Sequence, residues 1–121
     1  MISHPIIYTR DFQNDVPQPV EKPYARNVYW MYHLVLTGSH NGRRRDVTRR
    51  LAELGIETRD TFIPCNLQEI FIKQGWVKPD SCPKANTVAY AGFYLPSGLE
   101  LTEQELDYVA DNFIQILNSP A

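Results

Sequence analysis

The hydrophobic positions of the chain follow two patterns, short unbroken runs and helical stripes. Residues 28–36 read VYWMYHLVL, and such a run of aromatic and β-branched residues predicts a strand that is covered on both faces. Residues 43–54 place Val47, Leu51 and Leu54 at the four- and three-residue spacing of one apolar helix stripe. The sequence therefore predicts a strand followed by a helix.

The stretch GIETRDTFIPCNLQ comes next and predicts a return into the sheet. Gly55 suits the left-handed conformation that ends many helices. Residues 56–63 form a second predicted strand, which stops at the proline that follows. Asn66 and Glu69 match a capping box, which predicts a short helix over residues 67–71.

Another helix is predicted to begin at Ser81 and Pro83, because proline is accepted in the first turn, and to run to about Ala91. Its inward positions are predicted to be Ala85, Val88 and Ala89. Residues 92–98, GFYLPSG, interrupt this helix and are predicted to be extended.

The last predicted helix, residues 101–117, carries two local signals. Thr102 and Glu105 form a capping box, and the apolar positions repeat with helical spacing. The predicted inward stripe consists of Leu106, Val109, Phe113, Ile116 and Leu117.

These elements predict an α+β fold, a small antiparallel or mixed sheet with helices packed on one face. Residues 28–121 are expected to form a single domain. Residues 1–27 contain four prolines and are expected to be an extended lead-in, with a short strand at Ile6–Thr9.

Composition excludes several classes of protein. The chain has 121 residues, 43% hydrophobic and 21% charged residues, and a net charge of −2, which is ordinary for a globular domain and argues against a general nucleic-acid binder. No apolar run approaches the length of a membrane helix, and the N-terminus has no secretory signal pattern, so a cytoplasmic protein is expected. In that compartment Cys65 and Cys82 are expected to be free thiols.

Charged and titratable residues offer binding chemistry without a complete catalytic set. Arg43, Arg44, Arg45 and Arg49 are candidate anion-binding residues, although a solvated helix face explains the same pattern. His33, with no acidic neighbour to orient it, is expected to be a core or edge histidine rather than a general base. No metal-ligand spacing or glycine-rich phosphate loop is found.

Arg59 is the remaining polar candidate. An arginine in a strand that leads into a Pro-Cys-Asn turn can bind a carboxylate or phosphate through its fork of donors. It can equally pair with Glu57 or Asp60, and the spacing alone does not decide between these roles.

Three strings taken together resemble the C-terminal part of the DegT/DnrJ/StrS-type sugar aminotransferases, which are pyridoxal-phosphate enzymes of fold type I. They are YWMYHLVL, RRLAELGIETRDTFIPCNLQ and CPKANTVAYAGFYLPSGLELTEQELDYVADNFIQIL, and the similarity covers about residues 24 to 117. The set is specific in its order and spacing, whereas each string alone is not. Two positions depart from the family pattern, since Asp60 stands where a proline is typical and Asn66 where a histidine is common.

The resemblance implies that this chain corresponds to the small domain. In the family, the Schiff-base lysine and the cofactor's phosphate site belong to a large N-terminal domain, so this chain alone is expected to bind no cofactor and to have no catalytic residue. By position, Arg59 and Asn66 are expected to face the substrate, with Tyr29, Trp30 and Tyr32 supporting them. The expected partner is a large aminotransferase domain or a second copy of the chain.

Two functions follow for the chain. The first is the small domain of a nucleotide-sugar aminotransferase, inactive in isolation. The second is a non-catalytic interaction or dimerisation module whose arginine-rich helix contacts an anionic partner.

Overall fold

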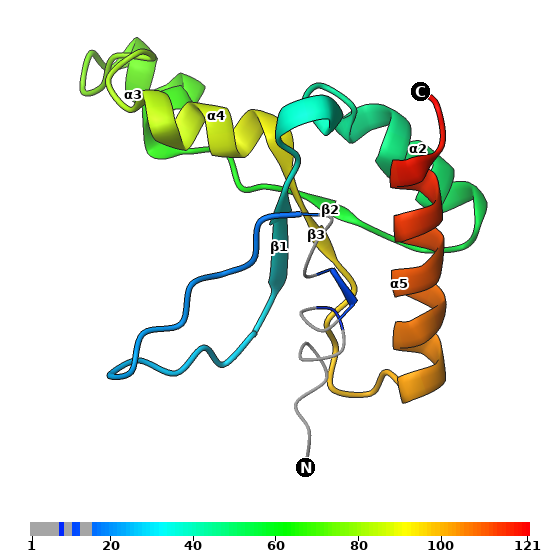
Figure 1. The fold of residues 1–121 in the computed structure, drawn as a ribbon. Helices are drawn as coiled ribbons and strands as arrows, with labels where there is room; N and C mark the ends of the chain where they lie inside the picture. Colours follow the sequence, from blue (N-terminus) through cyan, green and yellow to red (C-terminus); the bar gives the residue numbers. More distant parts are fainter. Residues whose placement is uncertain (1–7, 9–10, 13–15) are drawn as a thin grey trace.

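The computed structural model describes residue 8, residues 11–12 and residues 16–121, and it centres on a three-stranded antiparallel sheet (Figure 1). The strand order is β1-β3-β2, with bounds Tyr32–Val35 for β1, Gly92–Leu95 for β3 and Arg59–Asp60 for β2. Residues 92–98, predicted to be extended, thus supply the central strand. The predicted α+β class is confirmed.

Helices α2 (Arg44–Glu53) and α5 (Glu103–Asn118) pack against each other and cover one face of the sheet. In Figure 1 they lie on one side of the strands, while α3 (Glu69–Lys73) and α4 (Pro83–Ala91) project on the other side. Two 3₁₀ turns, η1 (Gly38–His40) and η2 (Cys65–Leu67), complete the described elements. The helices therefore leave one sheet face without a helical cover.

Helix α5 matches its prediction. The Thr102 hydroxyl accepts a hydrogen bond from the backbone N–H of Glu105 at 3.2 Å, and the Glu105 carboxylate accepts one from the N–H of Thr102 at 2.8 Å. These bonds satisfy two otherwise unpaired donors, which fixes the start of the helix. The predicted inward stripe is buried, namely Leu106, Val109, Phe113, Ile116 and Leu117.

Helix α2 matches its prediction except at its last apolar position. Val47 and Leu51 are buried, and Gly55 has a φ of 77°, so it ends the helix as predicted. Leu54 is 42% exposed because it lies at the C-cap, where the chain leaves the helix.

Strand β1 corrects the prediction of a strand covered on both faces. Tyr32 and Leu34 are buried, whereas His33 and Val35 are only half-buried. The alternation arises because α2 and α5 cover one face alone. Both predicted strands are shorter than predicted. Of residues 28–36 only Tyr32–Val35 pair with β3, and of residues 56–63 only Arg59 and Asp60 do.

The predicted cap at Asn66 is wrong. Helix α3 begins after Gln68, and the buried Asn66 amide instead donates hydrogen bonds to the Pro79 carbonyl and to Asn86 Oδ1, both at 2.8 Å. A long-range amide partner is not visible in a local sequence pattern.

The inward face predicted for α4 is wrong as well, although its bounds agree. Ala85 and Val88 are exposed and Ala89 is half-buried, because only the C-terminal end of the helix, at the buried Ala91, meets β3. Most of α4 therefore lies outside the core.

The proline-rich lead-in contributes to the same core as the rest of the chain. Tyr8, Phe12 and Val16 are buried, with the Tyr8 ring 5.0 Å from that of Tyr32 and the Phe12 ring 4.9 Å from that of Phe113. The strand predicted at Ile6–Thr9 lies outside the described residues except for Tyr8. The boundary at residue 27 remains a prediction.

Candidate functional site

The uncovered face of the sheet carries a row of three polar side chains, one from each strand. His33 of β1 is paired with Tyr94 of β3, and Arg59 of β2 is paired with the same Tyr94. Residues that lie directly opposite each other in a sheet point to the same face. The register therefore brings Arg59, a predicted site residue, into line with His33.

His33 is the centre of this row. Its Nε2 lies 2.7 Å from the Thr61 hydroxyl, and its ring centroid lies 4.8 Å from that of Tyr94. Burial lowers the pKa of His33 below its usual 6.5, because the partly desolvated imidazole disfavours the charged form. The imidazole is therefore neutral near pH 7 and bonded to a hydroxyl.

Gly92 leaves room for the contact between His33 and Thr61, because it has no side chain. A Cβ at this position of the central strand would lie 2.4 Å from His33 Nε2 and 2.5 Å from Thr61 Oγ1. The two side chains thus meet across the space that a side chain on Gly92 would fill.

Arg59 is exposed and already has a partner. Its guanidinium lies 2.8 Å from the Glu57 carboxylate, and both side chains are about three-quarters exposed, at 74% and 75%. Asp60 instead lies 3.9 Å from Arg44. An ion pair this exposed contributes little to stability, so the guanidinium remains available to a ligand.

The segment Arg59–Asn66 forms part of the wall of two hollows. Arg59 lies at one of about 270 Å³, and the residues after it line another of about 560 Å³. The first is lined by Met31, Glu57, Arg59, Tyr94, Leu95, Pro96 and Ser97. The second is lined by Arg44, Asp60, Thr61, Ile63, Pro64, Leu67, Asn86, Ala89 and Tyr90.

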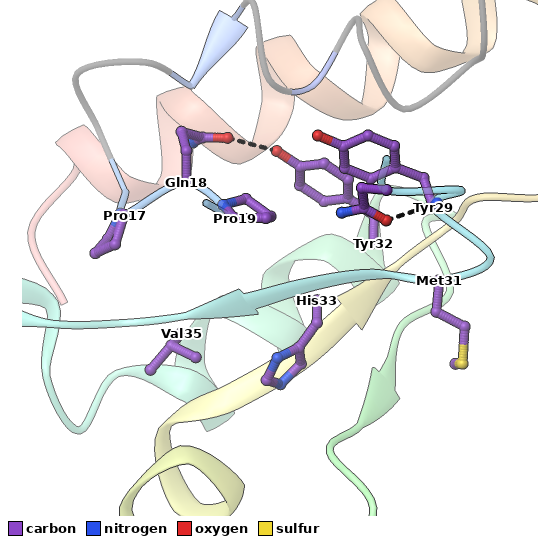
Figure 2. A pocket seen from close by; sticks show the side chains of 9 residues that line it. Pro17, Gln18, Pro19, Tyr29, Met31, Tyr32, His33 and Val35 are labelled. Atoms are coloured by element: carbon purple, nitrogen blue, oxygen red, sulfur yellow. Dashed lines mark hydrogen bonds between the residues drawn. The ribbon is translucent and has the colours of Figure 1, made fainter. Parts of the chain in front are cut away.

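The other predicted substrate-side residues do not gather with Arg59. Asn66 is 4% exposed, and its amide is bound within the chain. Tyr32 points to the opposite face of the sheet, where it is fully buried and donates its hydroxyl proton to Gln18 at 2.7 Å (Figure 2). Trp30 is 77% exposed.

Tyr29 lies at a third hollow, of about 370 Å³, beside β1, which is an edge strand of the described sheet. Figure 2 shows Tyr29 and Tyr32 on one side of β1, and Met31 and His33 on the other. Tyr29 has a φ of 48°, and its N–H donates to Asn27 Oδ1 at 2.8 Å. Left-handed backbone is strained for a tyrosine, and this local bond helps to hold it.

Two of the predicted anion-binding arginines bind carbonyl groups within the protein. Arg43 donates to the carbonyls of Ile116, Leu117 and Ser119 at 2.9 to 3.1 Å, at the C-terminal end of α5. Arg44 donates to the Ala89 carbonyl at 3.0 Å, at the end of α4. These arginines satisfy carbonyls that a helix end leaves unpaired.

The remaining arginines of α2 differ in their partners. Arg49 pairs with Asp46 and Glu53, and Arg50 pairs with Asp46. Desolvation raises the pKa of the Asp46 carboxyl, but the hydrogen bond from Arg49 and the charges of Arg50, Arg49 and Arg43 outweigh it, so the pKa of Asp46 is lowered. For the guanidinium of Arg45, an exposed residue, the described part of the chain provides neither a hydrogen bond nor an ion pair.

The lysines of this chain do not fit a pyridoxal-phosphate site. Lys22, Lys73, Lys78 and Lys84 are all exposed, whereas a Schiff-base lysine is activated by burial or by neighbouring cations. The described residues contain no group of three or more side chains suited to hold a metal ion. Among the same residues, no helix is both long and apolar enough to cross a membrane.

Sequence reasoning missed Thr61, Gly92 and Tyr94 as parts of the site. They meet His33 only through strand register, which no local pattern encodes. The string GFYLPSG was one available signal, because a glycine that opens a strand often marks a close approach of neighbouring groups.

Comparison with known proteins shows the family to which the chain belongs. The sequence model of the DegT/DnrJ/EryC1/StrS aminotransferase family matches residues 5–114. GDP-perosamine synthase of Caulobacter vibrioides is 30% identical over 104 residues, which are 86% of this chain and 27% of that enzyme.

Solved structures share the fold. Spr1654 of Streptococcus pneumoniae, assigned as a sugar aminotransferase and solved in its PLP form, superposes with a TM-score of 0.83 at 20% identity over 94% of this chain and 29% of its own. The sugar aminotransferase CalS13 of Micromonospora echinospora gives 0.74 at 21% identity over 93% of this chain and 28% of its own. The chain thus spans less than a third of each of these relatives.

Proposed function

Because this chain belongs to the DegT/DnrJ/EryC1/StrS aminotransferase family, we propose that it is the small domain of a nucleotide-sugar aminotransferase. On this proposal it acts in the cytoplasm, covers a pyridoxal-phosphate site held by a large domain, and catalyses nothing alone. When bound, that cofactor supplies the electron sink of transamination. The small domain supplies contacts on the substrate side.

The observation that carries the proposal is the fraction of the relatives that the chain spans. It covers 27% of GDP-perosamine synthase and 29% of Spr1654. The exposed lysines support the same view, since none has the enclosure that anchoring a cofactor requires.

A surface that points away from α2 and α5 is the proposed contact for the large domain. Two segments carry most of the exposed large apolar side chains of the described residues, an arm over residues 17–30 and the stretch 62–90. Both project away from α2 and α5 in Figure 1. These side chains are Val20, Tyr24, Val28 and Trp30 on the arm, and Phe62, Ile63, Ile70, Trp76, Val88 and Tyr90 in the stretch.

On the substrate side we assign the main role to Arg59. It is exposed, it lies at a hollow, and its carboxylate partner is itself exposed, so an anionic group can displace that partner at small cost. Trp30 and Tyr29 are the proposed apolar contacts from the arm. Asn66 and Tyr32 act as supports, because their polar groups are bound within the chain.

Two measurements test this function. Pyridoxal phosphate added to the purified chain is expected to give no stoichiometric lysine-bound absorbance band, and such a band would overturn the claim of inactivity. A Caulobacter GDP-perosamine synthase truncated to remove the matched region is expected to bind the chain and to regain turnover. The Arg59→Ala chain is expected to bind this truncated enzyme equally well but to support less turnover.

The second candidate function is an interaction module that binds an anionic partner through α2. Arg45 is the observation in its favour, because its guanidinium has no partner among the described residues. Salt-sensitive retention on heparin or nucleic acid that Arg45→Ala abolishes would favour this function over the first.

A further inference from the structure

We propose that His33 is a positioning residue, which holds the Arg59–Asn66 segment against the sheet through Thr61. The role given to that segment rests on the proposed function, but the positioning itself rests on the geometry around His33. The segment pairs with β3 through only two residues, Arg59 and Asp60, both exposed. Such a short edge strand needs further contacts to stay in register.

The contact between His33 and Thr61 supplies the first of these. Its 2.7 Å hydrogen bond joins β1 to the residue after β2 and so crosses the central strand at Gly92. His33 also packs against Tyr94, whose ring centroid lies 5.4 Å from that of Phe62. One imidazole thus fixes two consecutive residues of the segment, Thr61 directly and Phe62 through Tyr94.

Asn66 supplies the second contact at the far end of the segment. Its amide donates to the Pro79 carbonyl and to Asn86 Oδ1, which joins the segment to α4. Between these two attachments Phe62 and Ile63 are each 62% exposed. The chain therefore holds two apolar side chains outward on a segment that is fixed at both ends.

This geometry favours positioning over proton transfer for His33. Its Nε2 is engaged by Thr61, and its ring lies half-buried against Tyr94. Loss of the hydrogen bond would release Arg59 and the walls of the two hollows that the segment separates. Because the effect passes through Thr61, changes at His33 and at Thr61 should be equivalent.

Amide hydrogen exchange on the full chain tests the proposal. His33→Phe keeps a ring against Tyr94 but loses the hydrogen bond, and Thr61→Val loses it from the other side. Each is expected to speed exchange of the backbone amides from Arg59 to Phe62 by about fivefold, the size expected for one hydrogen bond. Amides of α5 should keep their rates.

The double variant and two conservative variants complete the test. His33→Phe with Thr61→Val is expected to match either single variant, because both remove the same bond. His33→Gln and Thr61→Ser retain hydrogen-bonding groups and should restore slow exchange. Additive effects, no local change, or no rescue by the conservative variants would overturn the positioning role.

The proposed function can fail separately. If the exchange results hold and the truncated relative does not bind the chain, the positioning role stands and the small-domain function is rejected. If His33→Phe fails to fold, Thr61→Val and Thr61→Ser report on the same bond from the half-buried hydroxyl side.

Discussion

Gly92 shows how much depends on a single missing side chain. A Cβ here would lie within 2.7 Å of three atoms, and one of them, the Val88 carbonyl oxygen, belongs to backbone that cannot swing away. Glycine is required at this position by crowding rather than by backbone angle, since its φ is −103°. The contact between His33 and Thr61 therefore depends on the missing side chain at Gly92.

Replacement of Gly92 by alanine is expected to destabilise the fold by about 1–3 kcal/mol, the usual cost of overpacking. Urea unfolding followed by circular dichroism measures the loss. Gly98→Ala is the matched control, because a Cβ there meets no atom within 4 Å and the loop is exposed. Equal stability of the two variants would contradict the crowding argument.

His33 gives the stability a defined dependence on pH. Burial lowers its pKa in the folded chain below the usual 6.5, so folding favours the neutral imidazole. The contribution is complete above pH 6.5 and is lost as the pH falls from there through the folded-state pKa. Tyr94, Thr61 and Gly92 are the groups that adjoin the ring.

Urea midpoints of the chain at pH 7.5 and 5.5 measure this dependence. The His33→Gln variant, which cannot titrate, is expected to lose less stability between these two values. Asp46 and Glu105, whose pKa is lowered in the folded chain, lose their stabilising contribution only at lower pH. They are present in both proteins, so they cancel in the comparison. An identical loss in both proteins would show that His33 does not titrate on unfolding.

At the scale of elements, the sequence predicts what local chemistry determines. Helix α5 combines a capping box with a complete apolar stripe, and both are confirmed. Helix α4 had correct bounds, because Pro83 marks its start, but its inward face was wrong. Its overall direction is set by contacts at Ala91 and Asn86, which lie outside any helical periodicity.

The site was predictable only where a single residue is unusual in its context. Arg59 was proposed from the sequence because an arginine in a strand that leads into a Pro-Cys-Asn turn can bind an anion. His33 and Thr61 are 28 positions apart, and each looks ordinary alone. Tyr8 and Phe12 were missed as core residues because the surrounding prolines dominate the pattern. The contact of His33 with Thr61 and the burial of Tyr8 and Phe12 both depend on non-local pairing, which a local pattern does not encode.

Arg43 links two elements that the sequence predicts separately. It is the N-cap residue of α2, and its guanidinium is bound to three carbonyls at the end of α5. Arg43→Ala is expected to cost about 1.5–3 kcal/mol, as for hydrogen bonds to a charged group, measured by urea unfolding. Arg45→Ala, an exposed neighbour in the same turn, should cost less than about 0.5 kcal/mol. Equal costs would mean that the hydrogen bonds from Arg43 to the end of α5 contribute nothing to stability.

At the scale of the molecule, the surface of α2 and α5 differs in chemistry from the surface that projects away from them. Among the described residues, α2 and α5 with their flanking positions carry ion pairs such as Arg49 with Glu53 and two large exposed apolar side chains, Leu54 and Tyr108. The arm and the stretch 62–90, which project away from these helices in Figure 1, carry ten. A surface this apolar is usually covered by a partner, so the chain alone is expected to associate with itself.

Replacing two of these side chains tests whether that surface drives association. Ile63→Ser with Tyr90→Ser alters the hollow of about 560 Å³ and replaces two apolar side chains, on residues that are 62% and 70% exposed, by hydroxyl groups. We expect the sedimentation coefficient of the unaltered chain to rise with concentration and that of this variant to rise far less. Leu54→Ser with Leu99→Ser is the matched control, since both leucines are exposed outside the surface. If the control suppresses association equally, general hydrophobicity rather than this surface is responsible, and the proposed contact for the large domain loses its support.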